Sequence, residues 1–187
     1  LRWMGRIAQQ HLDRREKAIA EVRTVAAAER RQREVRAKLL ELIGGLPEYD
    51  GPVNARTLGR LVNPSYTLEK VVYESLPGFF VTANLYRPNA PGRYPAVLLP
   101  AGHSTLGKTE NHRLGANLAS KGFVALAYDP VGLGERIQAL DPKTRRHAAG
   151  CCANEHLHAG AQSMLIGHSV ARYFVWDAKR SIDYLVS

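Results

Sequence analysis

Hydrophobic and polar positions follow a helical period in the first part of the chain. Residues 3–43 are dominated by Ala, Arg, Glu, Gln and Leu, which are good helix formers. Apolar side chains that share one helical face recur at Val35, Leu39, Leu42 and Leu46. The pair Gly44-Gly45 ends this pattern, as glycines often end helices. The pattern predicts one long helix or two consecutive helices, in an N-terminal helical extension over residues 1–46.

The period changes from helical to alternating after a stretch rich in proline and glycine. Residues 47–65 contain several of both residue types and are interpreted as an ordered loop or linker. Residues 66–76 and 79–86 then alternate and carry β-branched and aromatic side chains, with a Pro-Gly turn signal between them at 77 and 78. This arrangement predicts an antiparallel β-hairpin.

Two short, continuous apolar runs follow the hairpin. Residues 95–100 and 123–128 have the composition of strands that are buried on both faces of a sheet. Between them, residues 111–121 have a helical pattern that ends at Gly122. A strand, a helix and a strand joined by short connections form a crossover unit, which pairs the two strands in parallel. We therefore expect an α/β fold.

The last part of the chain is predicted to be mainly helical. Residues 137–158 are interpreted as irregular or partly helical, because they show no steady period. Residues 159–186 have a helical pattern, with a break expected near Gly167.

Composition and charge narrow the class of protein. The 187 residues are 45% hydrophobic and 23% charged, which is ordinary for a globular protein, and no apolar run approaches the roughly 18–20 residues that span a bilayer. The net charge is +9, but acidic residues are interleaved with the basic ones in the helical extension, as in the pair Glu34 and Lys38. This pattern favours a solvated, ion-paired helix face. We therefore expect neither a nucleic acid nor a membrane as a partner.

Two remaining features bear on cofactors and on the compartment. Cys151 and Cys152 are adjacent and cannot join distant segments, so we expect two buried or half-buried thiols. No second Cys or His pair lies at zinc-ligand spacing, and we expect neither a metal nor a cofactor. The first residues show no signal-peptide pattern, and the sequence leaves the compartment open: secreted or periplasmic if a signal has been removed, and cytoplasmic otherwise.

The candidate chemistry begins with a Gly-His loop, which we define as residues 101–107. The loop follows a buried strand and precedes a helix, so its backbone N–H groups can point into a cleft at the carboxyl ends of the strands. Donors at such a corner stabilise the oxyanion that forms during acyl transfer. The candidate oxyanion-hole and cleft residues are Gly102, His103 and Ser104.

Several of these segments resemble one protein group. The hairpin, the Gly-His loop after a buried strand and the sequence Tyr-Asp-Pro-Val-Gly-Leu-Gly-Glu-Arg at residues 128–136 resemble the alpha/beta-hydrolase superfamily. They are most similar to its bacterial acetyl-xylan-esterase-like and dienelactone-hydrolase-like members, and the segments 43–47 and 175–185 share this similarity. The resemblance implies that residues 47–187 form the N-terminal portion of such a domain, with an antiparallel hairpin followed by parallel strands.

The resemblance also implies a function and the roles of some residues. It implies a serine-type carboxylic ester hydrolase that forms an acyl-enzyme, with a small-molecule or carbohydrate ester as substrate. The residues that would shape the cleft rim are Asp129, Gly132, Gly134, Glu135 and Arg136. Nucleophile, acid and catalytic histidine follow in that order in this superfamily, on and after a Gly-x-Ser-x-Gly turn. We expect all three beyond Ser187, in a C-terminal half of the same fold, and expect this chain alone to be inactive.

The residues leave other sites open. Ser104 can be a nucleophile if Asp129 and one of three histidines complete a triad, those histidines being His147, His156 and His158. A second Gly-His-Ser ends at Ser169, but no strand precedes it. The sequence Glu155-His156-x-His158 has residue types that bind metals, without the spacing of zinc proteases.

Two other functions also remain open. The chain can be a hydrolase-like module that binds a partner without catalysis, or a fragment of a prolyl-oligopeptidase-like peptidase. Peptidases of the prolyl-oligopeptidase type usually carry a propeller domain. Nothing in this sequence repeats with the period of propeller blades.

Overall fold

The computed structural model describes all 187 residues and divides the chain into two compact units. The first unit is Leu1–Leu42 and the second is Ile43–Ser187. The division lies within the predicted extension, which ran to residue 46. Ile43 belongs to the second unit because it is buried there and its carbonyl accepts a hydrogen bond from the Ser169 N–H, at 3.2 Å.

The first unit consists of two helices, α1 (Arg2–Ala20) and α2 (Val25–Leu42). Of the two alternatives left open by the sequence, one long helix or two consecutive helices, the structure has the second. The Thr24 hydroxyl accepts a hydrogen bond from the Ala27 N–H at 3.1 Å, as a residue that begins a helix does. Neither helix contains a buried residue. Neither α1 nor α2, nor any other helix of the structure, is long and apolar enough to cross a membrane.

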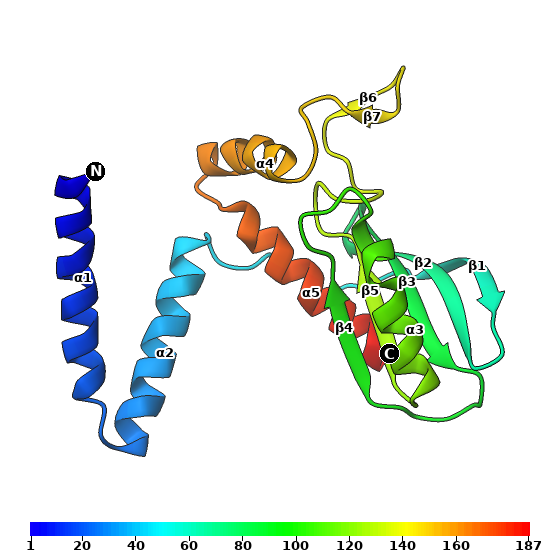
Figure 1. Ribbon diagram of the computed structural model, residues 1–187, viewed down its shortest axis with the longest axis horizontal. Coiled ribbons are helices and arrows are strands. Elements are labelled where there is room, and N and C mark those ends of the chain that lie inside the picture. Colours follow the sequence, from blue (N-terminus) through cyan, green and yellow to red (C-terminus); the bar gives the residue numbers. More distant parts are fainter. The chain divides into compact units, whose positions relative to one another are not determined.

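The second unit is built on a five-stranded sheet with the strand order β1-β2-β3-β5-β4 (Figure 1). The first three strands form an antiparallel meander, β3 also pairs antiparallel with β5, and β4 pairs parallel with β5. The hairpin and the parallel pair are both as predicted. The strands are β1 (Arg56–Val62), β2 (Tyr66–Leu76), β3 (Phe79–Pro88), β4 (Ala96–Pro100) and β5 (Val124–Tyr128).

The interpretation of residues 47–65 as loop or linker is wrong for β1. This strand lies at the edge of the sheet, and its side chains are mostly exposed, so it lacks the alternation by which strands are recognised. Its register with β2 shifts between Thr57 and Gly59, where the glycine accompanies a bulge. Pairing with β2 and the ion pair between Arg60 and Glu69 (2.9 Å) hold it in place. The strand is therefore formed by its neighbour rather than by its own pattern.

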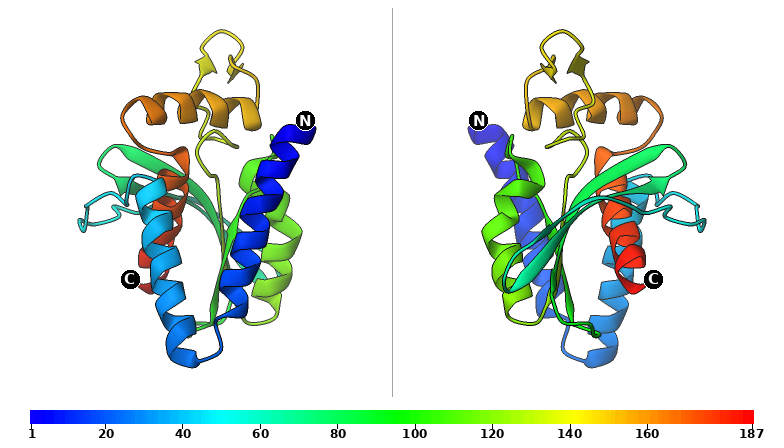
Figure 2. Two further views of the ribbon diagram at one scale, coloured as in Figure 1. Left: turned by 90° about the vertical axis from the view of Figure 1, so that its left-hand side faces the viewer. Right: turned by 90° about the vertical axis from the view of Figure 1, so that its right-hand side faces the viewer.

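The two faces of the sheet are covered by different helices (Figure 2). Leu126 packs with Val71 and Tyr73 in one core cluster, which α5 (Val170–Val186) covers. Its chain neighbours Ala125 and Ala127 point to the opposite face, where α3 (His112–Ser120) covers them. Because side chains alternate along a strand, a continuous apolar run supplies both cores at once.

The remaining elements of the second unit surround the carboxyl ends of β4 and β5. As predicted, the C-terminal helical region breaks near Gly167, which has a φ of +76°. The region expected to be irregular contains a two-stranded hairpin that the sequence pattern did not show. These elements are the 3-10 helix η1 (Gly107–Asn111), the strands β6 (Leu140–Asp141) and β7 (Arg146–His147), and the helix α4 (Ala153–Leu165).

Buried polar contacts fix α5 on the sheet. The Tyr73 hydroxyl lies 2.5 Å from that of Ser181, and the Trp176 indole donates to the Ser75 carbonyl at 2.8 Å. All four residues are buried. These bonds set the position of α5 along the sheet, and with it the positions of the side chains that α5 presents to the candidate site.

Candidate functional site

The candidate site lies where the parallel strands β4 and β5 end. The Gly-His loop follows β4, and the segment that begins with Asp129 follows β5. Carboxyl ends of adjacent parallel strands meet at one edge of the sheet, where ligands bind in open α/β sheets. The two predicted groups of site residues are therefore brought to the same edge.

The carboxylate of Asp129 joins the two segments through its hydrogen bonds, and we call this carboxylate and its donors the Asp129 hub. Its side chain is fully buried, and one oxygen accepts from the Lys108 backbone N–H at 2.6 Å. The other oxygen accepts from the Thr82 hydroxyl at 2.7 Å and from the Lys108 ammonium at 2.5 Å. The same ammonium lies 2.5 Å from Glu135 Oε2. The predicted rim residues Asp129 and Glu135 are thus held to the Gly-His loop by a lysine that the sequence analysis did not single out.

Two glycines make room for this hub. Gly107 and Gly134 both have a φ of +54°, and a Cβ added at either position would lie 2.2 Å from Asp129 Oδ1. Only glycine combines this backbone conformation with so close an approach. Gly132, with a φ of +79°, turns the chain against α4, where a Cβ would lie 2.8 Å from that of Glu155.

Arg136 connects the segment after β5 to α5. Its guanidinium Nη1 donates to Asp177 Oδ2 at 2.5 Å and to the Asp129 carbonyl at 3.0 Å, and both side chains of the ion pair are buried. The guanidinium carbon lies 4.9 Å from the centroid of the Phe79 ring. Arg136 therefore locks the rim segment between α5 and the turn between β2 and β3, which is a structural role.

The backbone of the Gly-His loop narrows the choice of oxyanion donor. The Ser104 N–H donates to the Gly102 carbonyl at 2.8 Å, so it is already engaged. The Ser104 hydroxyl accepts from the Leu106 N–H at 3.2 Å. The N–H groups of Gly102 and His103 have no partner within the chain. Of the three predicted residues, Gly102 and His103 are therefore the two whose backbone N–H groups are free to donate to a ligand.

Two histidines far apart in the sequence meet beside this loop. His103 Nε2 lies 2.9 Å from His156 Nδ1, and His156 Nε2 lies 2.8 Å from the Val131 carbonyl. A carbonyl only accepts, so His156 carries its proton on Nε2, and its Nδ1 accepts the Nε2–H of His103. Burial lowers the pKa of His156, and the nearby His103 lowers it further. Burial and the neighbouring His103 therefore favour the neutral form of the His156 ring.

The structure does not assemble the alternative triad around Ser104. The partners of the Asp129 carboxylate are Lys108, Thr82 and the Glu135 backbone N–H, and no histidine is among them. Ser169 begins α5, where its hydroxyl accepts from the Ala171 N–H at 3.2 Å. Both serines therefore act as hydrogen-bond acceptors for backbone groups.

The possible metal ligands on α4 are also used otherwise. Glu155 is fully buried and accepts hydrogen bonds from the Gln138 N–H at 2.8 Å and from His147 Nδ1, which lies 3.1 Å away. His158 lies 3.2 Å from the Gln162 amide nitrogen. No group of three or more metal-binding side chains is gathered in the structure. Glu155 instead ties the segment around β6 and β7 to α4.

The adjacent cysteines lie where α4 begins. The Cys152 thiol donates to Cys151 Sγ at 3.0 Å, and this hydrogen bond, with burial, raises the pKa of Cys152 to about 11. Both are free thiols, Cys152 buried and Cys151 half-buried, in agreement with the sequence analysis.

An apolar hollow of about 470 Å³ adjoins the Gly-His loop. Its lining includes Gly102 and His103 of the Gly-His loop, Tyr128 and Leu133, and Phe174 of α5. Burial raises the pKa of Tyr128 to about 12, so its hydroxyl stays protonated. The hollow includes Pro100, the last residue of β4, and β4 is the strand of the parallel pair that has one neighbour.

Comparisons with known proteins agree with this architecture. No protein-family model matches the chain, and no curated protein matches it significantly. Among solved structures, a provisionally named acetyl xylan esterase from Bacteroides fragilis NCTC 9343 superimposes with a TM-score of 0.66 at 17% identity, over 85% of this chain and 43% of its own. An acetyl xylan esterase from Paenibacillus sp. R4 superimposes with a TM-score of 0.50 at 20% identity, over 81% of this chain and 44% of its own.

These likenesses establish the fold. The second unit has an alpha/beta-hydrolase-type fold, as the resemblance in the sequence implied. The chain spans less than half of the length of either esterase.

Proposed function

We propose that this chain belongs to a serine-type carboxylic ester hydrolase and supplies its oxyanion hole. The carrying observation is the pair of unpartnered N–H groups at Gly102 and His103, at the carboxyl end of β4. Backbone donors fixed before the reaction stabilise developing negative charge in the transition state without reorganisation. The fold that the chain shares with two acetyl xylan esterases supports the same class of reaction.

In the proposed reaction the oxygen of a serine hydroxyl attacks the ester carbonyl carbon while the catalytic histidine takes the hydroxyl proton. The carbonyl oxygen takes up the negative charge and accepts hydrogen bonds from Gly102 and His103. Collapse of this intermediate expels the alcohol, which takes a proton from the catalytic histidine, and leaves an acyl-serine that water then cleaves to the carboxylic acid. Lys108 and Asp129 hold the Gly-His loop against the segment after β5, so that the two donors keep their positions.

We propose that the nucleophile, the acid and the catalytic histidine lie outside residues 1–187. The chain contains no Gly-x-Ser-x-Gly turn. The strand β4 has an unpaired edge, and its side chains are half-buried or exposed although Val97, Leu98 and Leu99 are apolar. An unpaired apolar edge favours the addition of a further strand. A strand added there would place its carboxyl end beside the Gly-His loop.

A fluorophosphonate probe, which labels activated serines, tests this proposal when the adduct is mapped by peptide analysis. In the full-length protein we expect label on a serine outside residues 1–187, together with hydrolysis of an aryl acetate and not of a prolyl amide. Label on Ser104 or Ser169 would refute the placement of the nucleophile. Absence of both label and hydrolysis would refute the enzyme class in favour of a binding module.

A further inference from the structure

Two thiols lie in contact immediately before the first residue of α4. Cys151 and Cys152 are both free, and their sulfur atoms are 3.0 Å apart, so each sulfur is within reach of a reaction at the other. Cys151 is half-buried and Cys152 is buried, so a reagent in solution reaches Cys151 first. Neither thiol belongs to the Gly-His loop or to the Asp129 hub, and the reaction proposed above uses neither of them.

The backbone at Cys152 has a conformation that residues with a side chain rarely adopt. Its φ is +57° and its ψ is −109°, which lies outside the left-handed and the right-handed helical regions. Side chains of adjacent residues diverge in a helix or a strand, whereas this backbone accompanies two sulfurs in contact. Strain of this kind persists only where the surrounding structure holds it, and it is concentrated at functional sites.

A small disulfide molecule can oxidise such a pair in two exchange steps. The hydrogen bond to Cys151, with burial, raises the pKa of Cys152 to about 11, so Cys152 keeps its proton and the Cys151 thiolate attacks first. The S–S bond of the small molecule breaks, one of its thiolates leaves, and a mixed disulfide forms on Cys151. Cys152 then gives its proton to water and attacks the Cys151 sulfur, which expels the second thiolate. The small disulfide is thereby reduced to two thiols, and the cysteine pair gives up two electrons and two protons.

The pair lies where α4 is attached to the rest of the second unit. The first turn of α4 carries Glu155, which is fully buried and accepts a hydrogen bond from the Gln138 N–H at 2.8 Å. It also carries His156, whose ring lies 2.9 Å from that of His103. The His156 N–H donates to the Cys152 carbonyl at 3.0 Å. A movement of the backbone at Cys152 is therefore passed on directly to the two side chains that hold α4.

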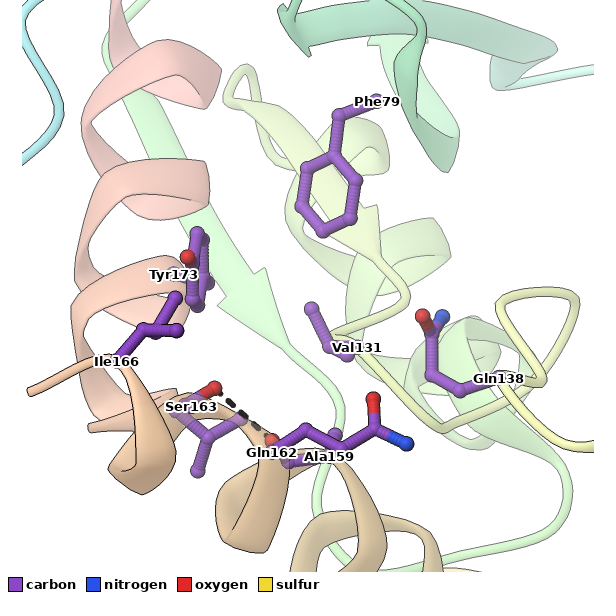
Figure 3. Close-up of a pocket in the computed structure, with 9 residues that line it drawn as sticks. Phe79, Val131, Gln138, Ala159, Gln162, Ser163, Ile166 and Tyr173 are labelled. Carbon is purple, nitrogen blue, oxygen red and sulfur yellow. Dashed lines mark hydrogen bonds between the residues drawn. The ribbon is translucent and has the colours of Figure 1, made fainter. Parts of the chain in front are cut away.

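The rest of α4 is loosely packed. Besides Glu155, its only buried residue is Ser163, whose hydroxyl donates to the Ala159 carbonyl of the same helix at 2.9 Å (Figure 3). A hollow of about 370 Å³ is lined by residues of α4, α5 and the segment after β5, so space is open beside the helix (Figure 3). Elements with few buried contacts shift or open with little loss of free energy. The position of α4 therefore depends on its first turn.

We propose that Cys151 and Cys152 form a redox-active dithiol, which a small disulfide such as oxidised glutathione converts into a disulfide between adjacent residues. The new bond closes a small ring that contains the peptide between the two cysteines, and the restrictive geometry of disulfides forces this peptide to move. The first turn of α4 then shifts, and His156 shifts relative to His103 of the Gly-His loop. An effect on ester hydrolysis rests on the proposed function, whereas formation of the bond does not.

Oxidised glutathione is the probe, added to the full-length protein after all thiols have been reduced. Peptide mass mapping after quenching with acid should show the peptide with both cysteines lighter by two hydrogen atoms and free of glutathione. In Cys152→Ser we expect glutathione to stay bonded to Cys151, because the second step lacks its attacking thiol. The double variant Cys151→Ser/Cys152→Ser is the control, in which this peptide should not react.

Amide hydrogen exchange measures the shift of α4. We expect the N–H groups at the start of α4 to exchange about tenfold faster in the oxidised protein, and those of α3, on the other face of the sheet, to be unchanged. Hydrolysis of an aryl acetate should fall by about tenfold on oxidation, because the donors of the Gly-His loop lose their positions. Reduction with dithiothreitol should reverse both changes, and the double variant should show neither.

Each result decides the proposal. Thiols that stay free, or glutathione that stays bonded to Cys151 in the unchanged protein, would overturn it, as would bond formation without faster exchange at the start of α4. Hydrolysis that is unaffected by the bond would contradict the link to the Gly-His loop. The two proposals are separable, since hydrolysis without bond formation contradicts this inference, and bond formation in a protein that does not hydrolyse the ester contradicts the proposed function.

Discussion

Single residues at the candidate site are constrained by the buried carboxylate of Asp129. Its four hydrogen-bond donors come from β3, η1 and the segment after β5, which meet only in the folded chain. A fully buried carboxylate is tolerated because its charge is paired and its oxygens are bonded. Residues that surround it should therefore respond to substitution far more strongly than similar residues elsewhere.

Gly134 should not tolerate a side chain. Gly134→Ala places a Cβ 2.2 Å from Asp129 Oδ1 in a residue with positive φ, so we expect a loss of about 3 kcal/mol in the free energy of unfolding. The control is Gly78→Ala, which also has positive φ but has no atom within 4 Å of the added Cβ, and should cost about 1 kcal/mol. Urea unfolding measures both values. Equal losses would show that backbone conformation alone decides the cost.

Lys108 should contribute more to stability than Lys38, an exposed lysine in an ion pair of similar length (2.5 Å for Lys108–Asp129 and 2.7 Å for Lys38–Glu41). Lys108→Met leaves Asp129 buried without its cation, and we expect the free energy of unfolding to fall by about 3 kcal/mol. Lys38→Met removes an exposed ion pair with Glu41 and should change it by less than about 0.5 kcal/mol. Thermal or urea unfolding compares the two. A Lys108→Met variant as stable as Lys38→Met would contradict the role of the ammonium in the hub.

The pH dependence of stability should report on His156. Burial lowers the pKa of His156 in the folded state below the usual histidine value of about 6.5, so the unfolded chain binds the proton more readily. Stability should then be highest above that value and fall as the pH drops below it toward the lowered pKa. We expect His156→Asn, whose amide does not titrate in this range, to lose less stability than the unchanged protein between pH 7.5 and 5.5. If the stability of His156→Asn and of the unchanged protein changed equally with pH over this range, the lowered pKa of His156 would be contradicted.

At the scale of elements, the helices differ in what forms them. The helix α5 buries Trp176, Asp177, Arg180 and Ser181 against the sheet, so packing and buried hydrogen bonds hold it. The helices α1 and α2 bury nothing within their unit, so helix propensity and local ion pairs such as Lys38–Glu41 support them. Short helices gain most of their stability from packing. Because α5 is packed on the sheet, it holds the side chains that it contributes to the candidate site in place.

Ser169, the residue that precedes α5, has a measurable role of its own. Ser169→Ala removes the hydroxyl that accepts the Ala171 N–H, and we expect a loss of about 1 kcal/mol in stability. Ser169→Asp keeps an acceptor at this position and should retain most of that stability. Both variants should hydrolyse an aryl acetate at the rate of the unchanged protein, because we place the nucleophile elsewhere. A loss of hydrolysis in the stable Asp variant would contradict that placement.

At the scale of the whole molecule, the two edges of the sheet differ in how well they are protected against pairing with a further strand. At one edge β1 carries the exposed Arg56 and Arg60, which discourage pairing with another chain, together with the exposed Leu58, Leu61 and Val62. At the other edge β4 is apolar and lacks a neighbour, and an apolar hollow adjoins it. Surfaces of this kind mark sites that other parts of a protein or another chain cover.

We expect isolated residues 1–187 to expose this apolar surface in solution. The dye ANS, which becomes fluorescent on apolar surfaces, should bind to them, and the fluorescence per molecule should fall in the full-length protein. Equal dye binding by the isolated residues and the full-length protein would contradict a covered β4 edge.

The sequence by itself determined the elements whose patterns are local. The hairpin of β2 and β3, the parallel pair of β4 and β5, and the break at Gly167 follow from alternation, apolar runs and glycine. It also determined that the Gly-His loop and the Asp129 segment lie at one edge of the sheet, because both follow parallel strands. These features depend on neighbours in the chain and on the two-residue period of strands.

Only the tertiary structure decided which side chains meet. His103 and His156 are 53 residues apart, Arg136 and Asp177 are 41 apart, and Lys108 and Asp129 are 21 apart. The edge strand β1 likewise depends on its pairing with β2 rather than on its own alternation. No local period records such partners, because a buried charge or imidazole is stabilised by whatever group the fold places against it. The candidate site is thus set by chain topology, and its hydrogen-bond network by long-range packing.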